Sequence, residues 1–247
     1  MDISFRNSFL EKWSKYFGDS ELPITFFYVE DPGDTARANL PDGHNCIVCE
    51  LGLVRKGRPL AWNVQSLGCG GARRYLGYTE QMRPNFEFFL SQGIPGELEG
   101  ERYIKTPEIV KEIMAKMRCI PANGRYIIFK RFDQLTPEDD PAAVIFFAKP
   151  DVLSGLFTLA NFDQPDGNGV IAPFSSGCGA MVYQAWFQGE QEHPKAILGM
   201  FDVSARPCVS RDILSFSVPM KKFKTMVGNM DESFLITETW NTVKKRL

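Results

Sequence analysis

The chain has 247 residues, of which 44% are hydrophobic and 23% charged, ordinary proportions for a globular protein. Its 28 basic and 30 acidic residues give a net charge of −2, which argues against a general nucleic-acid binder. The N-terminus shows no signal-peptide pattern, and the longest apolar run, residues 142–148, is too short to span a membrane. We therefore expect a cytoplasmic protein that binds neither nucleic acid nor a membrane.

Hydrophobic periodicity and turn residues predict the secondary structure along the chain. In chain order we expect a helix at 5–17, a strand at 22–29, a polar loop at 31–45, a helix at 47–54, a strand at 60–64, a glycine-rich turn at 68–71, a helix at 85–90, a charged loop at 93–105, a helix at 106–117, strands at 126–132 and 142–148, a helix at 150–160, strands at 170–174, 196–203 and 213–218, and helices at 220–230 and 232–245.

Strands and helices alternate through most of the chain, which favours an α/β fold, a mixed β-sheet with helices packed on it. No change of composition marks a domain boundary, so we expect a single domain over residues 1–247. The loop at residues 93–105 is the best candidate for a seam between two lobes.

One short motif occurs twice. Ser66-Leu67-Gly68-Cys69-Gly70 and Ser175-Ser176-Gly177-Cys178-Gly179 lie 109 residues apart, and each follows an expected strand. A distant internal duplication would explain this, but turn residues around a cysteine also recur by chance, so both explanations stay open.

Four cysteines stand at expected loop-to-helix junctions. Cys46 and Cys49 form a C-x-x-C pair, and Cys69 and Cys178 each stand between glycines. Thiolates at such positions are metal ligands or redox groups, and helix N-termini favour the thiolate form. The alternative is that they are small core residues, because free cysteine is often buried. Cys208 is a candidate substitute ligand, whereas Cys119 is interpreted as structural.

Charged residues flank these cysteines. His44 could ligate a metal or support a ligand, and Arg73 and Arg74 could balance an anionic cluster or bind an anionic molecule. Cys178 with His193 is a further candidate, as a nucleophile and its base, but His193 lies in a polar stretch typical of a surface loop. Phosphate-loop and serine-hydrolase motifs are absent.

Several segments together resemble the domain-of-unknown-function family 169, over about residues 9–245. They are Arg55-Lys56-Gly57, Ser66 to Gly71 with Arg74-Tyr75-Leu76-Gly77, Phe147 to Asp151, Val170 to Phe174 with Gly177-Cys178, and Asp202 to Arg206. The resemblance implies three fixed cysteines, Cys46, Cys69 and Cys178, and leaves Cys49 and Cys208 outside the pattern. It implies no activity, because the family is uncharacterised.

The sequence thus favours a thiolate-ligated metal site, iron–sulfur rather than zinc, for electron transfer or activation of a small ligand. Its expected ligands are Cys46, Cys69 and Cys178, with Cys49 as the fourth, and its partner is a small anionic ligand or a redox protein. The alternative is a metal-free binding or regulatory protein whose cysteines are structural or redox-active. Whether it is an enzyme stays open.

Overall fold

The computed structural model describes residues 1–247 and contains one eight-stranded mixed sheet, which confirms the expected α/β class. The strands lie in the order β2-β3-β4-β1-β5-β8-β7-β6. They are β1 (Ile24–Val29), β2 (Ala36–Arg37), β3 (Leu60–Trp62), β4 (Tyr126–Arg131), β5 (Ala143–Ala148), β6 (Val170–Ile171), β7 (Ala196–Gly199) and β8 (Leu214–Pro219). Strand β2 lies in the segment we expected to be a loop, and β6 is shorter than predicted.

Helices cover both faces of the sheet. The α-helices are α1 (Ile3–Phe17), α2 (Ile47–Arg55), α3 (Gly70–Tyr75), α4 (Phe86–Leu90), α5 (Pro107–Lys116), α6 (Pro150–Asn161), α7 (Gln184–Gly189), α8 (Met220–Asn229) and α9 (Glu238–Lys244). The shorter turns are η1 (Phe132–Gln134), the π-helix η2 (Gly179–Tyr183), η3 (Arg206–Cys208) and η4 (Phe234–Ile236). The last predicted helix is therefore split into η4 and α9.

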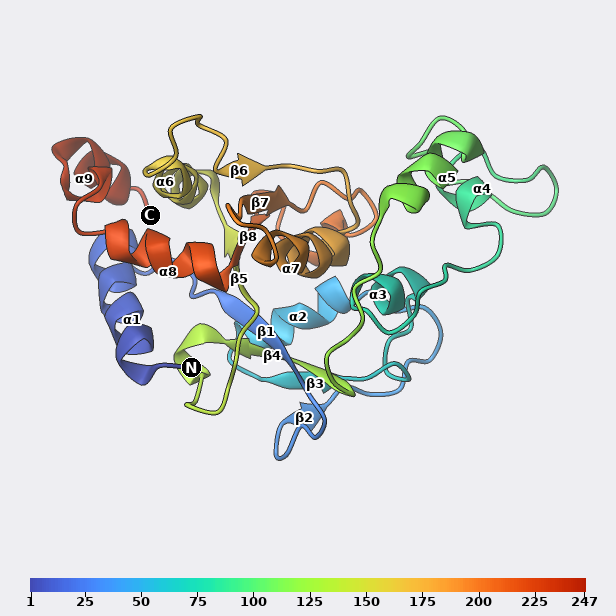
Figure 1. Cartoon of the computed structure of the whole chain (residues 1–247), viewed down its shortest axis with the longest axis horizontal. Helices are drawn as coiled ribbons and strands as arrows, with labels where there is room; N and C mark the ends of the chain where they lie inside the picture. The colour runs from blue at the N-terminus through green and yellow to red at the C-terminus, as the bar shows by residue number, and fades with distance from the viewer.

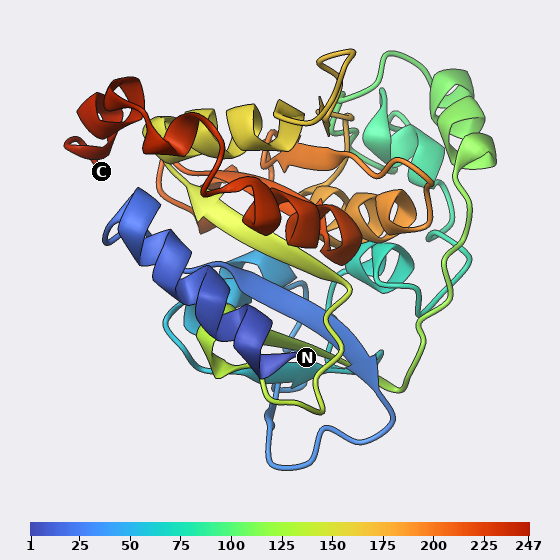
Figure 2. The same ribbon diagram turned by 60° about the vertical axis from the view of Figure 1, so that its left-hand side comes forward.

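Alternating strand residues build two cores, one on each face of the sheet. On β5, Val144 and Phe146 pack with α1, α6, α8 and α9. Figure 2 shows α1 and α8 lying over this face of the sheet. Ile145 and Phe147 face the opposite way and pack with α2, α3, η2 and α7. The cysteine-bearing helices are thus all on the second face, whereas α4 and α5 project at one end of the molecule (Figure 1).

The strand order contains an internal repeat. Strands β1 to β4 and β5 to β8 have the same pairing pattern. In the first set, β2 is parallel to β3, β3 is antiparallel to β4, and β4 is antiparallel to β1. In the second set, β6 is parallel to β7, β7 is antiparallel to β8, and β8 is antiparallel to β5. The two sets meet through the antiparallel pair β1 and β5. This topology is what a duplicated unit would give.

The repeat does not match the motif echo at Cys69 and Cys178. Cys46 precedes α2, which joins β2 to β3, and Cys178 precedes η2 and α7, which join β6 to β7. Cys46 and Cys178 are therefore the topological equivalents, and Cys69, after β3, corresponds to the turn after β7 that carries Cys208. Each half thus has one cysteine before the helix that joins its second and third strands, and another in the turn after its third strand.

No helix is both long enough and apolar enough to cross a bilayer.

Candidate functional site

Three sulfur atoms meet at the N-terminus of α2. Those of Cys46, Cys49 and Cys208 all lie within 4.8 Å of one another. Cys49 and Cys208 are joined by a disulfide that links positions 159 residues apart, whereas Cys46 is free. The disulfide ties α2 of the first half to η3 of the second, and its Cys49 side is exposed.

Cys69 and Cys178 do not belong to this group, although the charge of Cys69 acts on Cys46. Burial raises the pKa of the Cys46 thiol, and the charges of Cys69 and Asp202 raise it further, while the N–H groups of Val48 and Cys49 act in the opposite direction. Burial raises the pKa of the Cys178 thiol to about 12, a rise to which Cys69 and Cys46 add. The charge of Cys69 therefore acts on both the Cys46 and the Cys178 thiols.

Three of the four free thiols stand directly before helices, Cys46 and Cys69 in extended backbone and Cys178 in helical backbone. Cys46, Cys69 and Cys178 are the N-cap residues of α2, α3 and η2. The three expected ligands thus stand at helix starts, but Cys69 and Cys178 do not join the group of sulfur atoms within 4.8 Å, and the expected fourth ligand, Cys49, is bonded to Cys208. Whether they hold a metal stays a prediction.

Asn45 holds the Cys46 segment against the Cys69 turn. Its side-chain oxygen accepts a hydrogen bond of 2.8 Å from the Gly68 N–H, and its amide donates to Glu50 at 2.7 Å. Glu50 in turn accepts from the buried indole of Trp62 at 2.7 Å. A Cβ on Gly68 would lie 2.2 Å from the Asn45 oxygen, so this close approach requires glycine.

Asp202 makes the corresponding connection in the second half. One carboxylate oxygen accepts from the Gly177 N–H at 3.0 Å, and the other accepts from the Ser204 N–H at 3.0 Å and its hydroxyl at 2.7 Å. The carboxylate therefore joins the turn before Cys178 to the turn that leads to Cys208. Buried Met200, two residues earlier, has a φ of 68°, a left-handed conformation that is uncommon for such a side chain.

The remaining candidates are placed differently. His44 is exposed and does not join the group of sulfur atoms. Arg73 donates to the Leu67 carbonyl at 2.7 Å, whereas Arg74 is only 5% exposed. His193 has an 86% exposed side chain, so it does not serve the buried Cys178 as a base.

The loop at residues 93–105 lies beside the site. The pKa of Tyr103 is raised by burial and by a hydrogen bond with Glu101, and is lowered in part by a hydrogen bond with Ser204. Ser204 is the residue that Asp202 holds. The loop that we considered as a seam between lobes therefore reaches the edge of the cysteine site.

The residues that hold the cysteines in place were not predicted from the sequence. Asn45 is adjacent to Cys46, but its partner Gly68 is 23 residues away. Asp202 and Gly177 are 25 residues apart. The π-helix η2 was also missed, and such helices are frequent at functional sites. The Asp202-x-Ser204 pair, typical of a carboxylate that caps a turn, was the available signal.

A family model covers residues 16–229, including all the cysteines described above. The chain belongs to DUF169. This family is described as "Uncharacterised ArCR". Comparison of this DUF169 protein with the curated proteins and with the solved structures gives no match.

Proposed function

We propose that the cysteine cluster of this DUF169 protein is a thiolate-ligated metal centre when the Cys49–Cys208 disulfide is reduced. The observation that carries this proposal is the position of the Cys46, Cys49 and Cys208 sulfur atoms, all within 4.8 Å of one another. Metal–sulfur bonds of about 2.3 Å in a tetrahedral site place sulfur atoms ~3.8 Å apart. Reduction of the disulfide would free the Cys49 and Cys208 sulfur atoms to separate toward this spacing, beside the thiol of Cys46.

The donor set supports a single ion, zinc or iron, with an exchangeable fourth position. Three protein ligands and one open position are typical of reactive rather than structural zinc sites. Cys69, whose charge acts on Cys46, is the candidate for the fourth position. An iron–sulfur cluster, which the sequence favoured, would use the wider set of Cys46, Cys69 and Cys178. With iron the centre would serve electron transfer, and with either metal its open position would activate a small ligand.

The test is a metal count on full-length protein reconstituted anaerobically with zinc or with ferrous iron and sulfide. We expect about one ion per chain in reduced protein and almost none in the disulfide form. About four irons with broad visible absorbance would instead establish a cluster. Cys46→Ser and Cys208→Ser should lose a single ion, whereas Cys119→Ser, outside both cysteine sets, should retain it. Reduced protein that binds neither metal contradicts the proposal.

A second candidate function is reversible thiol–disulfide exchange, and the disulfide itself favours it. The free Cys46 sulfur lies within 4.8 Å of both bonded sulfurs, and the Cys49 side is exposed to an external dithiol. The Cys46 thiolate would form a bond to one of them and release the other as a thiolate. Equilibration in dithiol redox buffers measures the potential, and Cys46→Ser should slow the exchange several-fold if Cys46 takes part.

A further inference from the structure

Arg74 is a buried cation without a partner. The residue is 5% exposed, and its Nε atom is sealed from solvent with no hydrogen-bond partner. It takes part in none of the ion pairs of the chain, in contrast to Arg55 and Arg131, which pair with Glu21 and Asp133. Because a guanidinium stays charged in proteins, burial without an anion is strongly unfavourable.

The groups around Arg74 supply hydrogen-bond donors but no carboxylate that pairs with it. Tyr75 and Tyr183 lie with ring centroids 6.0 Å apart, and Arg74 acts electrostatically on both hydroxyls. A backbone N–H of Arg118 is directed at the Tyr183 hydroxyl. The nearby carboxylate of Asp202 is already used by Gly177 and Ser204.

These groups adjoin the thiols. The ring of Tyr75 lies 3.3 Å from the position that a Cβ on Gly179 would occupy, and Gly179 follows Cys178 directly. Arg74 itself is on α3, the helix that Cys69 caps. A small molecule with its charged end at Arg74 would therefore have its other end beside Cys178 or Cys69.

We propose that Arg74 anchors the oxyanion, a carboxylate or a phosphate, of a small-molecule ligand that the cysteine site receives. The planar guanidinium can donate two parallel hydrogen bonds to such a group, and its charge also acts on the hydroxyls of Tyr75 and Tyr183. The ligand neutralises a charge that the protein alone leaves unpaired. This inference goes beyond the metal proposal and does not require a metal.

The test uses the full-length, disulfide-bonded, metal-free protein, so that failure of the metal proposal leaves it unaffected. Thermal unfolding is followed with phosphate or with malonate, each against sodium chloride at equal ionic strength. We expect one of the two anions at 10 mM to raise the Tm by roughly 5 °C, as binding with a Kd of about 0.1 mM would do. The anion that acts identifies the source of the oxyanion.

Arg74→Met should abolish this rise without lowering the Tm in sodium chloride, because it removes an unpaired buried charge. Arg73→Met, on the same helix, should retain the rise. Arg74→Lys, which keeps the charge but not the planar fork, should weaken binding at least tenfold by calorimetry. This second variant keeps the test decisive if Arg74→Met does not fold.

Two outcomes overturn the proposal. The first is an anion test that does not depend on Arg74. Either neither anion raises the Tm of the wild-type protein, or an anion raises the Tm of Arg74→Met as much as that of wild type. The second is an Arg74→Met variant that changes metal content or thiol reactivity only in reduced protein, with no anion response in wild type. Arg74 would then balance thiolate charge, and the metal proposal would stand without an anion site.

Discussion

The Gly177 N–H donates a 3.0 Å hydrogen bond to the Asp202 carboxylate, and this contact connects two turns that both carry site cysteines. In the first half the same two places are connected by the Gly68 N–H and the Asn45 side chain at 2.8 Å. The connection is thus repeated with its direction reversed. In the first half the turn after β3 donates to the segment before α2, whereas in the second half the segment before η2 donates to the turn after β7. In each half, one side-chain acceptor, Asn45 or Asp202, connects the two segments that carry the cysteines.

Removal of the Asp202 carboxylate should destabilise the protein. Asp202→Ala leaves the buried Gly177 N–H unpaired, and we expect a loss of about 1–3 kcal/mol in the free energy of unfolding. Urea unfolding measures it, with the exposed Asp212→Ala as the matched control. Equal stability of the two variants would show that the connection contributes nothing.

Glycine is required at one position of the Cys69 turn and not at another. A Cβ on Gly68 would lie 2.2 Å from the Asn45 oxygen and 2.7 Å from the Gly43 carbonyl oxygen, whereas Gly70 has nothing within 4 Å. We expect Gly68→Ala to cost about 1–3 kcal/mol and Gly70→Ala to be neutral or slightly stabilising. Denaturant midpoints and the alkylation rate of Cys69 compare them. A neutral Gly68→Ala would contradict the close approach.

The disulfide should contribute strongly to stability because it closes a long loop. For cysteines 159 residues apart, chain entropy predicts a contribution of about 5 kcal/mol. We expect Cys208→Ser to lower the Tm of oxidised protein markedly, while Cys119→Ser leaves it unchanged. Dithiothreitol should lower the wild-type Tm toward that of Cys208→Ser. If reductant lowers the Tm of Cys208→Ser equally, another bond is responsible.

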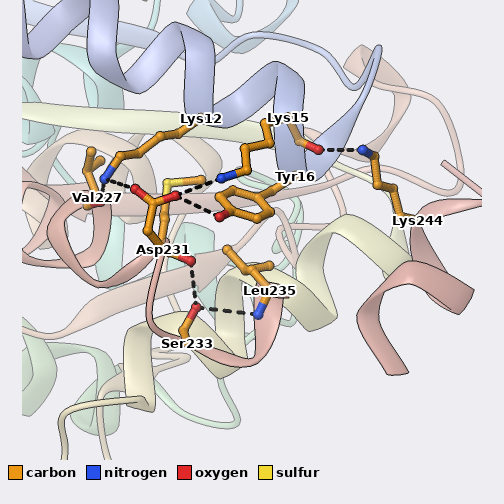
Figure 3. Close-up of polar contacts among 9 residues, drawn as sticks. Lys12, Lys15, Tyr16, Val227, Asp231, Ser233, Leu235 and Lys244 are labelled. Atoms are coloured by element: carbon orange, nitrogen blue, oxygen red, sulfur yellow. Dashed lines mark hydrogen bonds and ion pairs between the residues drawn. The ribbon is translucent and has the colours of Figure 1, made fainter. Parts of the chain in front are cut away.

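Asp231 should make the free energy of unfolding decrease as the pH falls below the ordinary pKa of aspartate. Hydrogen bonds from Lys12, Tyr16 and Lys15 hold the pKa of Asp231 well below its usual value (Figure 3). The Lys12 and Tyr16 contacts are 2.8 and 2.6 Å long, and they connect α1 to the segment after α8. The carboxylate therefore stabilises the fold fully above about pH 4 and loses this effect as the pH falls through its folded pKa.

Asp231→Asn removes this contribution, and we expect a loss of about 1 kcal/mol at pH 7, because the carboxylate is half exposed. The difference from wild type should shrink as the pH falls below 4. Urea unfolding at a series of pH values measures it, with the neighbouring exposed Glu232→Gln as control. A difference that is independent of pH would contradict the assignment.

The sequence by itself determined much of the local structure and the position of the cysteines along it. The periodicity of residues 5–17 and 106–117 predicts α1 and α5 to within two residues at each end, because helix formation depends on spacing within a few turns. It also placed Cys46, Cys69 and Cys178 at the starts of helices, since turn and cap residues act locally. The family resemblance named the same three cysteines.

Only the tertiary structure decided which of these residues meet. The partner of Cys49 is Cys208, which the spacing of Cys46 and Cys49 does not reveal. The equivalence of Cys46 with Cys178 follows from strand order, not from the repeated motif around Cys69. The burial of Arg74 without an ion-pair partner is likewise visible only in the folded chain. Such contacts join residues far apart in the chain, and their geometry is set by how the strands order themselves in the sheet.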